Sequence, residues 1–355
     1  MSKPQAAYLI RPIMQADAPT LLQLVKKSTG GLSSLQPRLD FLQDYIAYSE
    51  ASFAASLERE APHKYLLGLI DVKQNTLIGC AAVKTQVGIK EPFINFDIIG
   101  DGAEQYLRAS SRFKGVTEVG SLFLDPAYRA EGLGRYLAKS RYMLMATEPW
   151  RFGDTVIAEL RGICGAEGSP LYDHLFAEKL EQSFLEADAE YFDRNPQALG
   201  DIVPLSKIPV ADLPQTVRAS LAQPHESGRS AMRLLQDDGF IFSGTIDLFD
   251  GGPIMSCFQD TLRTPMESQL CDLQISPAAV QGDTALIATG ETVQDFQAII
   301  GQALVQTVEG HENLCLIGPE MADVLSGNSD TPVHVWQQAK RRKPRAKTAL
   351  VSQQV

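Results

Sequence analysis

A short motif near the middle of the chain has the residue types that bind a phosphate. Arg129, Gly132 and Gly134 form the pattern R-x-x-G-x-G. Glycine lets backbone N–H groups approach an anion without a Cβ in the way, and an arginine adds a charged donor. The same pattern occurs in tight turns whose glycines only relieve backbone strain, so the motif alone leaves both interpretations open.

The elements around the motif favour a phosphate. Residues 115–125, GVTEVGSLFLD, predict a strand buried on both faces, and a helix is predicted from Gly134 to about Ala146. The motif therefore lies at the start of a helix, where free N–H groups and the helix dipole favour an anion. No Lys-Ser or Lys-Thr pair follows and no glycine-rich finger precedes it, which excludes a Walker loop and a dinucleotide fingerprint.

The rest of the chain predicts a mixture of helices and strands. Outside the motif, the predicted elements are a short strand after Ala7, helices over 18–28 and 41–58, a hairpin over 64–87 that turns at Gln74–Asn75, and strands over 155–162 and 244–258. Asp17 is the expected N-cap of the first helix. This mixture indicates an α/β or α+β fold with a mixed central sheet flanked by helices.

The chain is predicted to divide into three parts. Residues 1–255 form the core, 256–335 a smaller β-rich portion, and 336–355 a basic, mobile tail. Within the core, the segments 169–184 and 226–242 resemble each other in their polar start, amphipathic helix and aromatic end. Two related halves, about 1–165 and 166–255, are one explanation, and chance similarity explains two copies of low identity equally well.

Composition and charge exclude several classes of protein. Of the 355 residues, 44% are hydrophobic and 21% charged, as in ordinary globular proteins. The net charge of −11 argues against nucleic acid as a partner and is compatible with a cationic substrate. No signal peptide or membrane-spanning run is recognisable, so no membrane partner is expected. The five scattered cysteines, without a CxxC pair, indicate reduced thiols in the cytoplasm.

No metal site is expected, because four of the five histidines have no partner at ligand spacing. They are His63, His174, His311 and His334.

The strand, the glycine loop and the following helix resemble the GNAT acyltransferase superfamily. The residues that carry the resemblance are SLFLDPAYR, from Ser121 to Arg129, followed by Gly-Leu-Gly. The resemblance implies that the loop from Arg129 through Leu133 and Gly134 to Arg135 binds the pyrophosphate of coenzyme A. It also implies that the preceding strand contacts the pantetheine arm. The strand residues concerned are Ser121, Leu122 and Phe123.

Five stretches in order resemble one family, the bacterial arginine N-succinyltransferases. They are KSTGGLSSL (27–35), VGIKEPFINF (87–96), LFLDPAYRAEGLGRYLAKSRYMLMA (122–146), VIAELRG (156–162) and IDLFDGGP (246–253). The resemblance implies transfer of succinyl from succinyl-CoA, a co-substrate that is not tightly bound, to the α-amino group of arginine or ornithine. The amine attacks the thioester directly. It also implies a homo-oligomer, or a hetero-oligomer with a related subunit.

The resemblance assigns the proton-transfer role to His225. An imidazole suits this role because its usual pKa is near neutrality, although a lone loop histidine is also often just an exposed or capping residue. Glu159 and Arg161 alternate on one strand, so they face the same side, either to bind the substrate or to form a structural ion pair. Gly30, Gly31 and Ser33 either shape the acceptor pocket or end a helix in an ordinary loop.

Two departures from the family pattern keep alternatives open. Gly120 stands where the family has a cysteine, which excludes an acyl-cysteine intermediate at that position. The stretch over residues 97–118 is shorter than in the family and lacks its polar insertion. Two alternatives are therefore an acyltransferase with another acyl group and amine, and a non-catalytic partner subunit.

Overall fold

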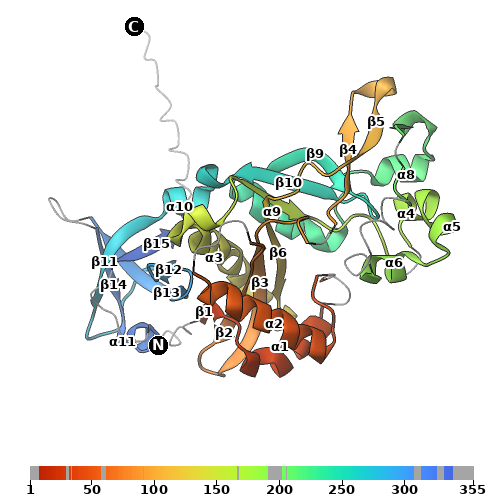
Figure 1. The fold of residues 1–355 in the computed structure, drawn as a ribbon. Coiled ribbons are helices and arrows are strands. Elements are labelled where there is room, and N and C mark those ends of the chain that lie inside the picture. The colour runs from red at the N-terminus through yellow and green to blue at the C-terminus, as the bar shows by residue number, and fades with distance from the viewer. Residues whose placement is uncertain are drawn as a thin grey trace, which may run out of the picture.

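The computed structural model describes residues 8–28, 32, 34–56, 61–90, 92–165, 168–190, 202–204, 206–307, 313–325 and 332–338. Within these ranges, 15 strands lie side by side in a single hydrogen-bonded series. Their order is β12-β15-β11-β14-β13-β1-β2-β3-β6-β7-β10-β9-β4-β5-β8. Figure 1 shows the last strands of the chain at one end of the molecule and the helices α4, α5, α6 and α8 at the other.

The centre of the sheet is built from the first half of the chain. Its strands are β1 (Tyr8–Pro12), β2 (Lys64–Asp71), β3 (Thr76–Lys84), β6 (Thr117–Leu124) and β7 (Thr155–Glu159). All neighbours in this group pair antiparallel except β6 and β7, which are parallel. A parallel pair requires a crossover between its strands, and the helix α3 (Leu133–Thr147) supplies it.

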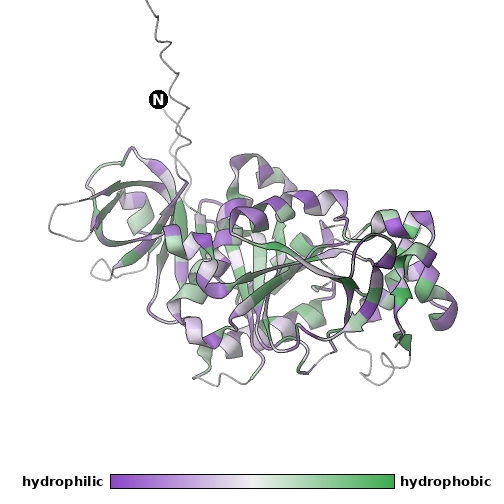
Figure 2. Cartoon of the chain, turned by 90° about the horizontal axis from the view of Figure 1, so that it is seen from above, coloured by the Kyte–Doolittle hydropathy of each residue, from purple (hydrophilic) through white to green (hydrophobic). Residues whose placement is uncertain are grey.

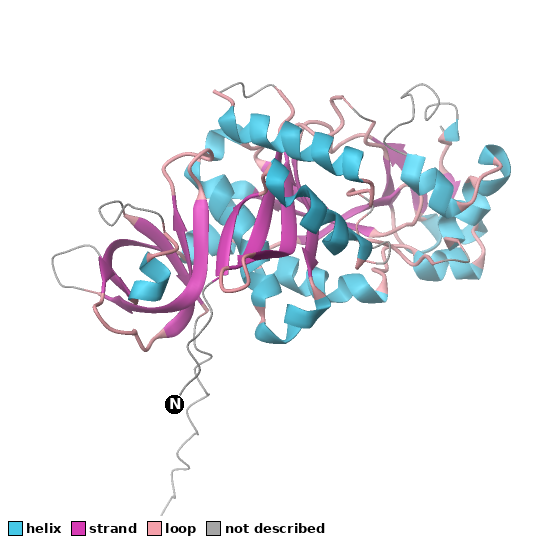
Figure 3. Ribbon diagram, turned by 90° about the horizontal axis from the view of Figure 1, so that it is seen from below, coloured by secondary structure: helices cyan, strands magenta, loops and turns pink. Residues whose placement is uncertain are grey.

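Helices cover both faces of these central strands (Figure 3). On β2, Leu66 and Ile70 pack against α1 (Ala18–Lys26) and α2 (Leu39–Ala54), whereas Leu67 packs on the other face with α3. This alternation follows from the two-residue period of a strand. In Figure 2 the central strands are mostly green, in agreement with a core on both faces of the sheet.

The sheet continues through residues from the middle of the chain. Its strands here are β10 (Pro253–Phe258), β9 (Ile241–Asp247), β4 (Asn95–Ile99), β5 (Tyr106–Ser110) and β8 (Ile208–Pro209). The helices of this part are α4 (Pro170–Leu175), α5 (Ala177–Leu180), α6 (Phe184–Glu190), α8 (Gln215–Ser220) and α9 (Arg229–Asp237). A separate aromatic core, with Phe96, Tyr172 and Phe249 among its members, packs α4, α5, α6 and α8 onto the sheet. α9 packs instead on the core around α3, through Leu235.

The remaining strands continue the sheet beyond β1 and close on themselves, because β12 pairs with both β15 and β13. They are β11 (Gln269–Ile275), β12 (Asp283–Thr289), β13 (Gln297–Gln306), β14 (Asn313–Ile317) and β15 (Val333–Gln337), with the helices α10 (Arg263–Glu267) and α11 (Pro319–Ala322). β13 pairs antiparallel with β1, so this part of the chain is hydrogen-bonded to the N-terminal strand.

Short 3-10 helices connect several of these elements. They are η1 (Gln15–Asp17), η2 (Gly102–Glu104), η3 (Pro126–Glu131), η4 (Pro149–Arg151), η6 (Val210–Asp212), η7 (Glu226–Gly228) and η8 (Gln259–Thr261). No helix among the described residues is long and apolar enough to cross a membrane.

The predicted mixed fold is confirmed, but several elements were not predicted and some local features differ. The strand predicted over 244–258 is two strands, β9 and β10, separated by the turn between them. Asp17 does occupy the N-cap of α1, but its carboxylate bonds Arg11 and the backbone N–H of Met14 instead of the helix. The hairpin β4–β5 had no counterpart among the predicted elements. β4 pairs with β9, about 150 residues further along the chain, and local sequence patterns carry no signal for such distant pairing.

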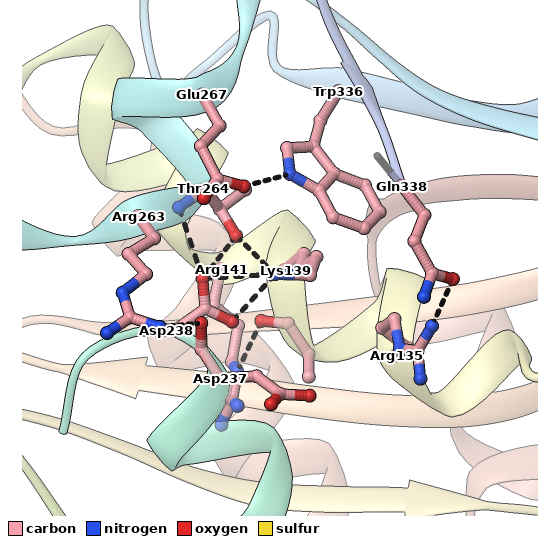
Figure 4. Close-up of polar contacts among 11 residues, drawn as sticks. Arg135, Lys139, Arg141, Asp237, Asp238, Arg263, Thr264, Glu267, Trp336 and Gln338 are labelled. Carbon is pink, nitrogen blue, oxygen red and sulfur yellow. Dashed lines mark hydrogen bonds and ion pairs between the residues drawn. The ribbon is translucent and has the colours of Figure 1, made fainter. Parts of the chain in front are cut away.

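A buried ion pair joins α3 to the chain segments that follow it (Figure 4). Lys139 contacts both carboxylate oxygens of Asp238, at 3.1 and 2.9 Å, and the hydroxyl of Thr264 at 2.8 Å. Its ammonium also lies 4.3 Å from the ring centre of Trp336 on β15. α3 is thereby tied to the end of α9, to α10 and to the C-terminal strands.

We expect Asp238→Asn to lower the free energy of unfolding by about 3 kcal/mol or more, because it leaves the buried Lys139 charge without its carboxylate. Urea denaturation of the variant and the wild type measures this difference. Asp237→Asn is the matched control, since Asp237 is the exposed neighbour. Equal losses in the two variants would contradict the prediction.

Candidate active site

The strands β6 and β7 separate soon after they begin to pair. Their parallel register contains Thr117 with Val156 and Glu118 with Ile157. β6 continues to Leu124, whereas β7 pairs along its whole length with β10. In the described part of the chain, no strand covers the β7-facing edge of β6 beyond Glu118. Backbone N–H and C=O groups of β6 are therefore available there to a ligand.

A β-bulge lies in the same part of β6. The register of β6 against β3 shifts between Cys80 and Ala82, and Ser121 on β6 has a φ of 49°. A positive φ is uncommon for a residue other than glycine and marks a constrained backbone. The hydroxyl of Ser121 lies 2.8 Å from that of Ser34, which follows α1. The bulge is thus joined to the loop between the two N-terminal helices.

The predicted phosphate loop lies at the start of α3. Gly132 is the N-cap, with a φ of 71° that favours glycine, and the helix begins at Leu133. Arg129 bonds the carbonyl of Leu124 at 3.4 Å and lies 5.7 Å from the ring centre of Phe123. The side chain of Arg135 hydrogen-bonds that of Gln338. The structure thus brings the predicted cofactor residues together, around the helix start and the strand before it.

A cavity of about 230 Å³ opens between the separated strands. It is lined by Leu32, Ser34, Lys84, Glu118, Val119, Gly120, Ser121, Leu122, Arg141, Ala158, Glu159, Leu160, Arg161, Asp188, Ser227, Gly228, Ala231, Leu235, Asp247, Phe249 and Asp250. The lining joins β6, β7 and α3 to α6, α9 and the turn after β9. Residues from both halves of the chain therefore form one site.

Most charged groups of the cavity are already paired. Lys84 contacts Glu118 at 3.1 Å, and Arg161 contacts Asp188 at 2.9 Å and Asp250 at 3.5 Å. Burial lowers the pKa of Lys84, but the charge of Glu118, its hydrogen bond and the other acidic groups nearby together outweigh this effect and raise the pKa overall. The sequence left two roles open for Arg161, substrate binding or a structural ion pair. In the structure it forms ion pairs.

Three acids of the cavity titrate above their usual range, and for Asp188 burial raises the pKa although Arg161 lowers it. The pKa of Glu159 is raised well above 4.5 by burial, and by the negative charges of Asp247 and Glu118. Glu159 accepts a hydrogen bond of 3.2 Å from the amide of Asn95. Burial and the charge of Asp247 raise the pKa of Asp250 to about 8. A cation entering this cavity would stabilise these carboxylates in their charged form.

The turn that carries Asp250 is pressed against the end of β7. A Cβ on Gly252 would collide with the carbonyl of Leu160, so the DGGP turn needs glycine at this position. The backbone N–H of Gly252 donates to the Asp250 carboxylate at 2.8 Å. The close approach places Asp250 beside Arg161.

His225 lies at the rim of the cavity. Its backbone N–H donates to the carbonyl of Arg161 at 2.7 Å, and its Nδ1 accepts from the N–H of Ser227 at 3.3 Å. Ser227 and Gly228 line the cavity, whereas His225 itself is not a lining residue. Nδ1 also lies 2.8 Å from the hydroxyl of Ser227.

The predicted pocket residues Gly30, Gly31 and Ser33 lie outside the described residues. Their neighbours Leu32 and Ser34 do line the cavity.

Sequence reasoning missed six charged residues of the cavity. They are Lys84, Glu118, Arg141, Asp188, Asp247 and Asp250. The motif IDLFDGGP contains the last two, and its two acids three residues apart before a tight turn were the available signal. At Gly120, a Cβ would lie 3.1 Å from Glu118 Oε1, so the missing side chain leaves room for this carboxylate.

These features define an acyltransferase of the GNAT type. The bulged strand, its separation from a parallel neighbour and the glycine loop at a helix start form the arrangement that the sequence resemblance implied. The structure of arginine/ornithine succinyltransferase subunit AI from Pseudomonas aeruginosa has the same fold, with a TM-score of 0.80 and 24% identity. The match covers 94% of this chain and 99% of that one.

The sequence comparisons define the family more narrowly. A family model described as "Arginine N-succinyltransferase beta subunit" matches residues 8–264. The arginine N-succinyltransferase of Escherichia coli strain UTI89 is 30% identical over 329 residues, which cover 89% of this chain and 94% of the relative. That of strain K12 / DH10B is 30% identical over 325 residues, covering 88% and 93%. The chain belongs to the arginine N-succinyltransferase family, as its sequence motifs indicated.

We expect Glu159 to make the fold less stable as the pH rises. Its raised pKa means that the folded state binds the proton more tightly than the unfolded state. The free energy of unfolding therefore falls as the pH rises from 4.5 toward the folded-state pKa. Glu159→Gln removes this loss, so the variant should gain stability relative to the wild type as the pH rises above 4.5.

Urea denaturation across this pH range measures the effect. Glu178→Gln, which changes an exposed acid on α5, is the matched control and should follow the wild type. Parallel curves for Glu159→Gln and the wild type would contradict the prediction.

Proposed function

We propose that this protein transfers the succinyl group of succinyl-CoA to the α-amino group of arginine, or of ornithine. The observation that carries the proposal is the cavity between β6 and β7, which meets the predicted coenzyme A strand on one side and a group of carboxylates on the other. Membership of the arginine N-succinyltransferase family supports the same reaction.

Coenzyme A fits the groups around β6 and α3. The pyrophosphate would bind the N–H groups at the start of α3, with Arg129 and Arg135 as charged donors. The pantetheine amides would pair with the free edge of Ser121, Leu122 and Phe123, as an added strand does.

A cationic acceptor fits the charges on the opposite side. Five carboxylates line the cavity, from Glu118, Glu159, Asp188, Asp247 and Asp250, against three cations, from Lys84, Arg141 and Arg161. A guanidinium or ammonium group compensates this excess and forms charge-assisted hydrogen bonds with carboxylates. Glu159 accepts a hydrogen bond from the neutral amide of Asn95 and forms none of the ion pairs described above, so it is well placed to accept such a bond.

The reaction needs one proton removed from the attacking amine. The amine nitrogen bonds to the thioester carbonyl carbon, the C–S bond breaks, and the thiolate of coenzyme A takes up a proton. His225 would accept the amine proton, directly or through a water, and pass it toward the leaving thiolate. The carbonyl of Arg161 and the N–H of Ser227 hold this residue at the cavity rim.

The cytoplasm suits a protein that uses succinyl-CoA and has free thiols, and we propose that location. Both the family description and the Pseudomonas aeruginosa structure refer to subunits, which supports an oligomer of this chain or of this chain with a relative.

The purified protein should release free coenzyme A from succinyl-CoA when arginine is present. A thiol reagent measures the release, and mass spectrometry identifies N-succinylarginine. A panel of acyl-CoAs against amino acids tests the specificity. Measurable coenzyme A binding without turnover for any pair would contradict the proposal and favour a non-catalytic partner subunit.

His225→Ala should lower kcat by about 10²-fold or more, the usual effect of losing a general acid or base. The control is His174→Ala, because His174 is exposed on α4 and does not line the cavity. Turnover close to that of the wild type in the His225 variant would move the proton-transfer role to another residue.

A further inference from the structure

Arg141 is a buried cation that faces the cavity. It lies in the middle of α3, is only 3% exposed, and lines the space between β6 and β7. Its Nη1 donates to the carbonyl of Gly120 at 3.4 Å and its Nε to the carbonyl of Ala138 at 3.1 Å. Both acceptors are neutral, and two carbonyls do not compensate a buried guanidinium charge.

The nearest acid is already committed to other groups. In Figure 4, dashed lines join Asp238 to Lys139 and Thr264, and none joins it to Arg141. Asp238 accepts hydrogen bonds from the Lys139 ammonium, and from both the N–H and the hydroxyl of Thr264. Among the described residues, no carboxylate lies within ion-pair distance of Arg141, which therefore keeps donors for a ligand that enters the cavity.

The position of Arg141 indicates which part of a ligand it would meet. It lies seven residues after Gly134, about 10 Å along α3 from the predicted phosphate loop. It bonds Gly120, directly beside the bulge at Ser121. An acyl-CoA that places its pyrophosphate at the helix start and its pantetheine arm along β6 would bring its acyl group toward this bulge.

The lining near α9 suits a short hydrocarbon chain. Ala231 and Leu235 are one turn apart on α9, face the cavity, and belong to the apolar cluster that packs on α3. A ligand with methylene groups and a terminal carboxylate would satisfy both this apolar wall and the guanidinium.

We propose that Arg141 determines acyl specificity by binding the free carboxylate of a dicarboxylic acyl group, such as the succinyl group of succinyl-CoA. This inference rests on the proposed function and adds the residue that selects a succinyl over an uncharged acyl group. A guanidinium binds a carboxylate through two parallel hydrogen bonds, which a methyl-terminated acyl chain of the same length cannot form.

The carboxylate of the amino-acid acceptor is the other anion in the proposed reaction that has the chemistry to bind Arg141. The five acids of the cavity, which suit the acceptor's cationic groups, come from β6, β7, α6 and the turn after β9. Arg141 comes from α3, the helix that begins at the coenzyme A loop. The acyl donor is therefore the partner that its position favours.

Equilibrium binding tests the inference without any acceptor. The wild type should bind succinyl-CoA about 10- to 100-fold more tightly than butyryl-CoA, which has the same chain length and no charge. Arg141→Gln should abolish this preference, mainly by weakening succinyl-CoA, while the affinity for free coenzyme A stays at the wild-type value. Isothermal titration calorimetry measures all three ligands.

Arg129→Gln is the matched comparison, because its predicted contact is a phosphate common to the three ligands. It should weaken coenzyme A, butyryl-CoA and succinyl-CoA by the same factor. A preference for succinyl-CoA that persists in Arg141→Gln overturns the inference and leaves the proposed function standing. If Arg141→Gln raises the KM for arginine and leaves the affinity for succinyl-CoA unchanged, the inference is also overturned, and the proposed function still stands. A wild type without any preference and without succinyl transfer overturns the proposed function itself.

Two further measurements apply if Arg141→Gln does not fold. Arg141→Lys keeps the charge but not the two parallel donors, and it should retain only part of the preference for succinyl-CoA. In a structure of the wild type with succinyl-CoA, the acyl carboxylate should lie within hydrogen-bond distance of the Arg141 guanidinium. A carboxylate bound elsewhere overturns the inference.

Discussion

The candidate site depends on one constraint, the early separation of the parallel strands β6 and β7. The two strands share a register over Thr117 and Glu118, and β7 then follows β10 while β6 continues alone. An interior parallel strand normally has both edges paired, so this separation leaves backbone groups of β6 open inside the molecule. The cavity, the open edge of β6 that we propose for coenzyme A, and the place of the bulge at Ser121 in the cavity wall all follow from it.

The helix α3 serves the fold and the site through neighbouring positions. Its first turn provides N–H groups for a phosphate, as its N-terminal position requires. Two turns further on, Lys139 and Arg141 are both buried, but their environments differ. Lys139 is compensated by Asp238 and has a structural role, whereas Arg141 reaches the cavity with neutral partners, two carbonyls and the ring of Tyr142. The two cations of this helix therefore differ in whether an acid pairs with them. Lys139 has such a partner, whereas Arg141 does not and is available to a ligand.

The acids of the cavity show how two distant parts of the chain build one electrostatic environment. Glu118 and Glu159 come from the first half, and Asp188, Asp247 and Asp250 from the second. Their mutual repulsion and their burial raise the pKa of Glu159 and of Asp250. Such a cluster is unfavourable without a compensating cation, and Lys84 and Arg161 provide only part of this compensation. The remaining excess is what fits a cationic amino acid.

The sequence by itself determined the local features of this protein. The strand before Asp125, the helix after Gly132 and the glycine loop between them follow from periodicity and from glycine, which act over a few residues. The family followed from five stretches in a fixed order. Only the tertiary structure decided that Arg161 is held by Asp188 and Asp250, and that Arg141 faces the cavity without a carboxylate partner. Burial and ion pairing depend on residues about 20 to 100 positions away, which local sequence patterns do not encode.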